Sequence, residues 1–171
     1  KILGIDPGTN IMGFGLIELI GQKITLLELD ILILNKIKSP NLKLKKIYEK
    51  TCFLISTYQP NELAIEAPFF GKNVQSMLKL GRAQGVSMLA GINNNIPIFE
   101  YAPKKIKLAV TGKGQASKEQ VASMLMYMLK IKKKPKYLDS TDGLAVAVCH
   151  AMQKKISKNI ETEVKNWTDF I

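Results

Sequence analysis

Four acidic side chains occupy positions from which they could act together on a substrate. Asp6 ends an apolar stretch directly before Pro7-Gly8, and Glu66 ends a second apolar stretch. Strand ends of this kind meet at the edge of an α/β sheet where ligands bind. Asp139 and Asp142 lie three residues apart at the start of a predicted helix, so both can share one face. Each acid alone could equally be a paired charge or a helix cap, but together they predict a cluster of four carboxylates.

A cluster of four carboxylates needs a counter-charge. Mutual repulsion would raise the pKa of at least one carboxyl group, and divalent cations relieve that repulsion. Oxygen ligands favour Mg²⁺ or Mn²⁺, whereas zinc is disfavoured because the chain has two distant cysteines and one histidine. We interpret that histidine, His150, as structural, because it lies about 12 Å along its helix from Asp142. Two metal ions would suit phosphodiester hydrolysis, since one activates water and the other stabilises the leaving oxygen.

The charge balance indicates a polyanionic partner. The net charge is +11 and the isoelectric point is about 9.6. Ten lysines lie between residues 103 and 137, where Glu119 is the only acid. Lysine contacts to phosphates release condensed counterions, so this clustering favours nucleic acid. A generally lysine-rich surface is the alternative explanation, because it would give the same balance without a ligand.

The predicted elements place the four acids on one mixed sheet. Strands are predicted over residues 1–6, 11–20, 23–34, 62–67 and 96–101, and helices over 40–58, 74–92, 117–130 and 140–152. Strands joined by short turns pair antiparallel, whereas strands joined across helices pair parallel. We therefore expect an α/β fold with three antiparallel strands, then two parallel strands, and helices on both faces.

Three details of the helices can be tested directly. The 74–92 helix repeats apolar residues at spacings of three and four, which predicts that this stripe packs in the core. Ser117 and Gln120 have the form of a capping box. Ser140 is expected to cap the last helix.

The length of 171 residues fits a single domain. No apolar run reaches the roughly 18 residues that a membrane span requires. Cys52 and Cys149 are too few for a disulfide framework, which favours a reducing compartment. We therefore expect a cytoplasmic protein with no membrane segment.

Four segments of the chain, in order and in register, are similar to one known family. The segments are Gly4–Thr9 with Gly13-Phe14-Gly15, Ala64–Glu66 with Leu78–Val86, Phe99–Pro103 with Gly112–Lys118, and Asp139–Ala145. Together they resemble the RuvC family of bacterial Holliday-junction resolvases. The resemblance covers residues 1–152 and implies an RNase H-like resolvase domain there, which leaves 153–171 as a C-terminal extension or tail. One departure is Gly143, where the family usually has Ala, and we expect it to affect metal binding little.

The resemblance also implies a role for individual residues. Asp6, Glu66, Asp139 and Asp142 match the metal-binding catalytic acids, with two Mg²⁺ per active site and Mn²⁺ as a substitute, and Lys118 matches a catalytic lysine. The DNA-contacting positions would be Phe69, Lys72, Asn73, Lys104, Lys105, Lys107, Lys113 and Lys118. Phe69 would stack on bases at the opened junction centre, although a place in the core is the alternative for this ring.

The implied activity is a Mg-dependent endonuclease that cuts four-way DNA junctions by symmetric paired nicks in recombination and repair. It implies a homodimer, in which the 74–92 helix would let a two-fold partner approach through its small residues Gly81, Ala83 and Gly85. The family works with the branch-migration proteins RuvA and RuvB.

Two alternatives stay open, namely an RNase H-like nuclease that acts on RNA and a non-catalytic junction-binding module. A sugar-kinase-like ATPase is excluded because the chain is too short for its second domain.

Overall fold

The computed structural model describes residues 1–68, 73–133 and 135–168, with side chains to residue 156. Its five-stranded sheet has the order β3-β2-β1-β4-β5. The strands are β1 (Ile2–Asp6), β2 (Ile11–Ile20), β3 (Lys23–Ile33), β4 (Glu62–Glu66) and β5 (Ile98–Tyr101). β1, β2 and β3 pair antiparallel, whereas β4 pairs parallel with both β1 and β5. The predicted mixed sheet is confirmed.

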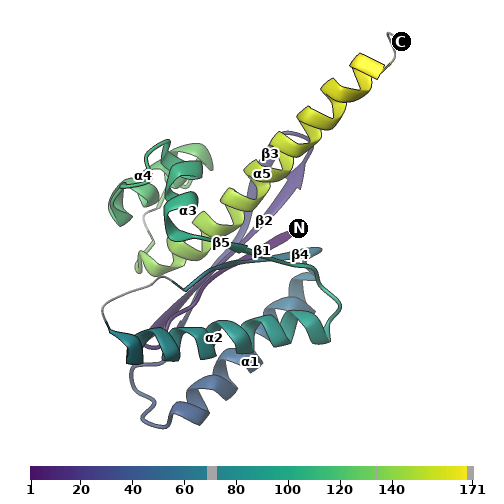
Figure 1. The fold of residues 1–171 in the computed structure, drawn as a ribbon. Coiled ribbons are helices and arrows are strands. Elements are labelled where there is room, and N and C mark those ends of the chain that lie inside the picture. The colour runs from purple at the N-terminus through teal and green to yellow at the C-terminus, as the bar shows by residue number, and fades with distance from the viewer. Residues whose placement is uncertain (69–72, 134, 169–171) are drawn as a thin grey trace.

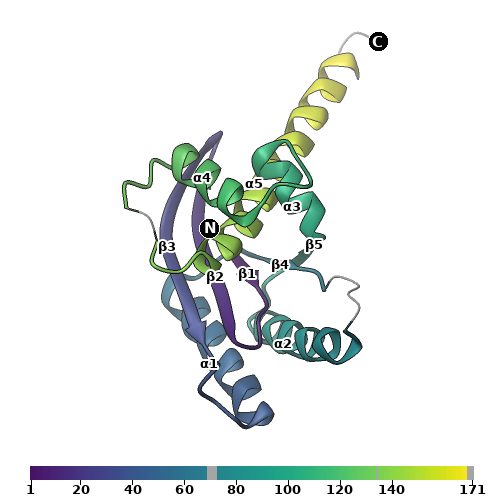
Figure 2. The same ribbon diagram turned by 90° about the vertical axis from the view of Figure 1, so that its left-hand side faces the viewer.

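Helices cover both faces of this sheet, as predicted. On one face lie α1 (Pro40–Tyr58) and α2 (Val74–Asn93), and on the other lie α3 (Pro103–Thr111), α4 (Lys118–Met128) and α5 (Asp139–Thr168) (Figures 1 and 2). Two hydrophobic cores result, because successive side chains of a strand point to opposite faces. Leu3 and Ile5 of β1 belong to the core under α1 and α2, whereas Ile2 belongs to the core under α5.

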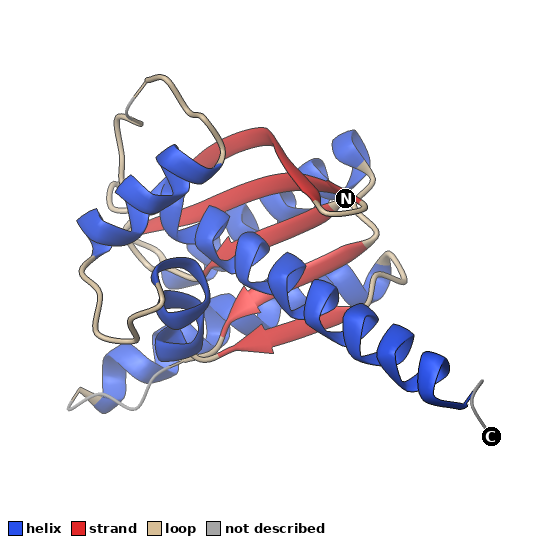
Figure 3. Ribbon diagram, turned by 90° about the horizontal axis from the view of Figure 1, so that it is seen from above, coloured by secondary structure: helices blue, strands red, loops and turns tan. Residues whose placement is uncertain are grey.

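Helix α5 crosses the sheet obliquely and lies directly on the strand backbones (Figure 3). A Cβ atom added to Gly13 of β2 would lie 1.8 Å from the carbonyl oxygen of Asp139, and one added to Gly143 would lie 2.7 Å from the Gly13 carbonyl. A Cβ atom added to Gly4 on β1 would lie 2.2 Å from the carbonyl oxygen of Gly143. We call this contact between β1, β2 and α5 the glycine seam. It fixes the first turn of α5, which carries Asp139 and Asp142, relative to the strands.

Helix α2 packs with a different face from the one predicted. Its buried residues are Ala83, Gln84, Ser87, Ala90 and Gly91. The apolar stripe instead faces outward, with exposed fractions from 48% to 62% at Val74, Leu78, Leu89 and Ile92. The helix does pack in the core as predicted, through Ala83 and Ala90, but its apolar stripe is not the face that it buries. Ala83 is therefore not available for the two-fold contact expected of it. Periodicity identified the helix, but small residues turned out to make the close contact with the sheet.

The ends of the other helices show one confirmed prediction, one error and one omission. The Ser117 hydroxyl accepts from the Gln120 amide N–H at 3.2 Å, and the Gln120 side chain accepts from the Ser117 N–H at 2.9 Å, which confirms the capping box. Ser140 is not a cap, because α5 begins at Asp139 and the Ser140 hydroxyl donates to the Tyr137 carbonyl. Helix α3 was not predicted at all.

The last helix continues beyond the expected domain boundary. Residue 152 lies inside α5, which runs without a break to Thr168 and extends past the edge of the sheet (Figure 1). Lys154 donates to the Glu62 carboxylate and Lys155 to the Gln22 carbonyl, so the start of the expected extension contacts the sheet. In the described part of the chain, no helix has both the length and the apolar character needed to cross a membrane.

Candidate active site

Two of the predicted acids meet because their strands are parallel neighbours. Asp6 ends β1 and Glu66 ends β4, and the register pairs Ile5 with Ile65 directly before them. Their carboxylates therefore leave the sheet at the same edge. Both side chains line a pocket of about 230 Å³ at this edge. Asp6 and Glu66 are therefore close together, as their places at the ends of apolar strands predict.

Helices α3, α4 and α5 complete the pocket. Asp142 from α5, Lys118 from α4 and Lys107 from α3 line it with the two strand-end acids, and Pro103, Ile106, Val121 and Ala145 form its apolar wall. The Lys118 ammonium donates to Asp142 Oδ2 at 2.6 Å and lies 4.0 Å from Asp139 Oδ1. The Asp139 side chain is 33% exposed and that of Asp142 only 14%. Asp139 therefore stands at the outer margin of the cluster.

The carboxyl groups in this pocket are hard to ionise. Burial raises the pKa of Asp6 well above its ordinary value, and the charges of Glu66 and Asp142 raise it further. Burial and the charge of Asp142 raise the pKa of Glu66 to about 7. Burial also raises the pKa of Asp142, although the hydrogen bond from Lys118 opposes this shift. These are the effects expected when carboxylates share a site without enough positive charge.

The chemistry of this donor set fits divalent cations. The ligands would all be carboxylate oxygens, which suit Mg²⁺ or Mn²⁺, and a bound cation would offset the repulsion between the carboxylates. Among the described residues, no three His, Cys, Asp or Glu side chains lie close enough together to enclose an ion as they stand. The cation that the cluster does contact is the Lys118 ammonium.

Apart from Lys118, which contacts Asp142 in the acid cluster, the predicted DNA-contacting residues fall into three groups. Lys107 lines the acid pocket, Lys104 and Lys105 are exposed on α3, and Lys113 is exposed in the turn after α3. Asn73 is the N-cap of α2, and its side chain accepts from the Ser76 N–H. Phe69 and Lys72 lie outside the described residues.

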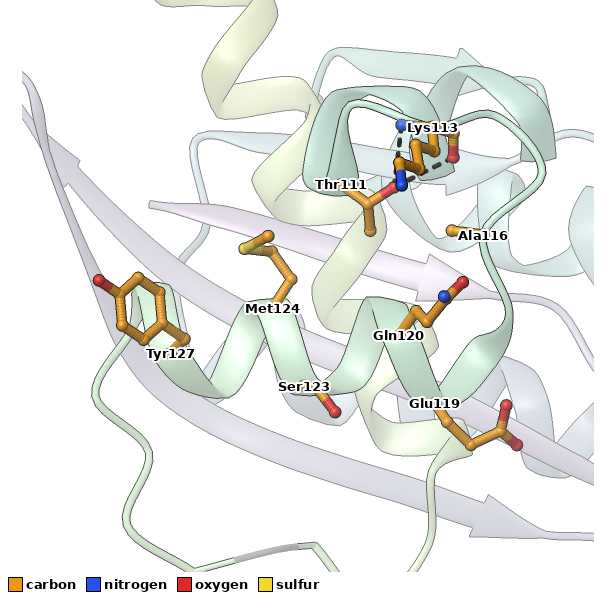
Figure 4. Close-up of a pocket in the computed structure, with 8 residues that line it drawn as sticks. All are labelled: Thr111, Lys113, Ala116, Glu119, Gln120, Ser123, Met124 and Tyr127. Atoms are coloured by element: carbon orange, nitrogen blue, oxygen red, sulfur yellow. Dashed lines mark hydrogen bonds between the residues drawn. The ribbon is translucent and has the colours of Figure 1, made fainter.

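A second pocket, of about 530 Å³, lies on the other side of α4 from the acids. Figure 4 shows Met124 and Tyr127 of α4 along this pocket, with Thr111 and Lys113 from the end of α3 opposite them. The Thr111 hydroxyl binds both the carbonyl and the N–H of Lys113, which closes the turn after α3. None of the predicted acids lines this pocket.

His150 is structural, as predicted, and belongs to a network that the sequence did not reveal. The ring is buried, with Nδ1 2.6 Å from the Tyr101 hydroxyl and Nε2 2.9 Å from the Glu62 carboxylate. Phe99 packs against the same ring with the centroids 4.4 Å apart. Burial lowers the pKa of His150 despite the neighbouring Glu62. Glu62 begins β4, whereas Tyr101 ends β5 as the register partner of Glu66, so the network connects the start of β4 with the end of β5.

The sheet order, together with acids at two neighbouring parallel strand ends and on a final helix, defines an RNase H-like nuclease. More specifically, the chain belongs to the RuvC family, because the family model described as crossover junction endodeoxyribonuclease RuvC matches residues 2–150. The predicted family and the predicted class of enzyme, an endodeoxyribonuclease, are confirmed.

Curated relatives and solved structures agree with this assignment. The RuvC of Christiangramia forsetii is 64% identical over 149 residues, covering 87% of this chain and 78% of the relative. That of Cytophaga hutchinsonii is 55% identical over 170 residues, covering 99% and 84%. T. thermophilus RuvC in complex with a Holliday junction substrate superimposes with a TM-score of 0.84 at 28% identity, covering 91% of this chain and 95% of that one. The yeast mitochondrial resolvase Ydc2 has a TM-score of 0.72 at 13% identity, covering 98% and 84%, and shares the fold.

Proposed function

We propose that this protein resolves four-way DNA junctions by hydrolysing one phosphodiester bond in each of two opposed strands. The observation that carries the proposal is the pocket in which Asp6, Glu66 and Asp142 face Lys107 and Lys118. Carboxylates and ammonium groups side by side are what metal-assisted attack on a phosphate requires. The similarity to a RuvC bound to a Holliday junction supports the choice of substrate.

Asp6, Glu66, Asp142 and Asp139 would hold two Mg²⁺ ions, for which Mn²⁺ could substitute. When bound, such ions activate the attacking water and stabilise the leaving oxygen. Lys107 would neutralise phosphate charge at the same pocket, because its side chain lines the pocket without a carboxylate partner within 4.0 Å among the described residues. The apolar wall of the pocket limits the access of bulk water, which strengthens each of these electrostatic interactions.

The lysines around the pocket would hold the DNA backbone. Lys104 and Lys105 are exposed on α3, the helix that carries Lys107, and Lys113 is exposed in the turn after it. Phosphate contacts of this kind position a duplex without reading its sequence. Base stacking by Phe69 and a backbone contact by Lys72 are part of the proposal through the resemblance alone.

A homodimer would present two such pockets to two opposed strands. The outward stripe of α2 supports this arrangement, because a monomer seldom leaves a contiguous apolar face of this kind in water. Gly81 and Gly85 lie on the stripe, and a Cβ atom added to either would meet nothing within 4 Å, so a partner helix could approach closely. We extend the proposal to RuvA and RuvB as partners in the cytoplasm on the resemblance alone.

A synthetic four-way junction with one labelled strand at a time tests the function. With Mg²⁺, the protein should nick two opposed strands at symmetry-related positions, and a plain duplex should stay intact. The variant Asp6→Asn should bind the junction and leave it uncut, because a neutral amide replaces a carboxylate ligand.

The same assay separates the alternatives. Tight junction binding without cleavage in either Mg²⁺ or Mn²⁺ would contradict the proposal and favour a junction-binding module. Preferential cleavage of an RNA-containing substrate of the same shape would favour a nuclease that acts on RNA, since discrimination requires contacts to the 2′-hydroxyl.

A further inference from the structure

Lys118 is a cation already seated within a cluster of acids. We propose that Lys118 is a built-in counter-ion, which holds the carboxylates together before metal binds and is displaced from Asp142 when metal enters. This inference rests on the proposed function, because it concerns the same metal-binding carboxylates. It assigns Lys118 a task in the metal-free protein that precedes any contact with a phosphate.

The contacts of Lys118 show what it does before metal binds. Its Nζ atom donates to Asp142 at 2.6 Å and lies 4.0 Å from Asp139. No other lysine, arginine or histidine in the described part of the chain comes within 4.0 Å of Asp6, Glu66, Asp139 or Asp142. Among the described residues, Lys118 therefore makes the only ammonium contacts within 4.0 Å to this cluster, to two of its four carboxylates, whereas Lys107 acts on Glu66 and Asp142 through its charge at a greater distance.

The position of Lys118 at the start of α4 does not stabilise that helix. Lys118 is the first residue of α4, where a positive charge faces the positive end of the helix dipole and is disfavoured. The carboxylates of α5 across the pocket compensate for this position. The lysine is therefore held by the acid cluster and not by its own helix.

Lys118 is also able to leave. Its side chain is 57% exposed, whereas that of Asp142 is 14% exposed. The long stem can turn into solvent, or toward a phosphate at the mouth of the pocket, without disturbing the core. An Asp142 oxygen that coordinates a metal ion cannot keep its full hydrogen bond to the ammonium, so metal and lysine compete.

Competition predicts the sign of a mutational effect. In calorimetric titrations of the protein alone with Mg²⁺, Lys118→Met should bind the ion about tenfold more tightly or better, since a hydrogen bond to a charged group opposes binding in the wild type. Lys107→Met is the matched control, because it removes an equal charge from the same pocket without breaking a carboxylate contact. Its affinity should rise much less. Equal or weaker Mg²⁺ binding by Lys118→Met, or an equal gain in both variants, would overturn the proposal.

A measurement on the unmodified protein guards against a variant that fails to fold. Acylation of lysine amines, followed by peptide mass spectrometry, should show Lys118 becoming several-fold more reactive when Mg²⁺ is added, while Lys107 changes little. Unchanged or reduced reactivity of Lys118 at saturating Mg²⁺ would refute displacement. Neither experiment contains DNA, so a protein that failed to cut junctions could still pass both, and the two proposals can fail separately.

Discussion

Replacing Gly13 by alanine tests whether the glycine seam positions the active site. An added Cβ would lie 1.8 Å from the Asp139 carbonyl oxygen, whereas real Cβ contacts essentially never fall below 3.0 Å. The first turn of α5 must therefore move by at least about 3.0 − 1.8 = 1.2 Å away from β2. The obstacle is the backbone of Asp139, and the position of a Cβ atom is fixed by its own backbone, so no side-chain rotation can relieve the clash.

The expected cost has two parts. Overpacking of a close-packed interior destabilises a protein by about 1–3 kcal/mol, and we expect the upper end because the added Cβ atom meets backbone, which cannot rotate away. Displacement of Asp139 and Asp142 by about 1 Å should lower junction cleavage about a hundredfold, since misplacement of that size has such an effect on catalytic geometry. Both losses originate from one contact.

Urea unfolding and single-turnover cleavage at saturating Mg²⁺ measure the two losses separately. Gly114→Ala is the matched control for stability, because the nearest atom to its added Cβ is the Lys104 carbonyl oxygen at 3.6 Å, an ordinary contact. Gly114→Ala should leave the unfolding midpoint almost unchanged. If Gly13→Ala unfolded at the wild-type midpoint and cut at the wild-type rate, the glycine seam would not be what positions the acids.

Three further predictions concern β4 and the α2 stripe. In metal-free protein the pKa of Glu66 is raised to about 7 from 4.5, so the folded state holds a proton that the unfolded state releases. The free energy of unfolding should therefore fall by up to about 3 kcal/mol as pH rises from 4.5 to above 7. Urea titrations in EDTA should show that Glu66→Gln flattens this fall. Glu62→Gln, at the other end of β4, should instead lower the free energy of unfolding by about 1–3 kcal/mol, because it weakens the acceptor of His150 and Lys154. Leu78→Glu should convert the proposed dimer to a monomer in light scattering without changing the far-ultraviolet circular dichroism, because this side chain is 52% exposed; a dimer that survived would place the interface elsewhere.

The sequence predicted the parts of the site that depend on strand ends. Asp6 and Glu66 each end an apolar strand, and a parallel pairing is enough to put both at one edge. The contact between Lys118 and Asp142 could not be predicted in this way. It depends on how α4 packs beside α5, and no local pattern connects two residues that lie 24 positions apart.

Helix α3 escaped prediction although its boundaries carry a signal. Pro103 stands at its first turn, and Gly112 follows its last residue with a left-handed φ of 72°. Proline at the start and glycine just after the end are typical of helices. The apolar face of α3 is short, consisting of the buried residues Ile106 and Val110, and the lysines of this segment make its apolar pattern weak. Similarly, periodicity found α2 but could not distinguish its outward stripe from its packed face.

The glycine seam also implies an order in which the candidate active site is assembled during synthesis. Folding during synthesis proceeds from the N-terminal side, and a partly made chain can carry Asp6 and Glu66 on β1 and β4 well before α5 exists. Asp142 joins them only after the ribosome has passed the last turns of α5 that pack on the sheet and the helix has settled onto Gly4 and Gly13. A chain that ends before α5 therefore lacks Asp139 and Asp142, and with them half of the predicted acid cluster.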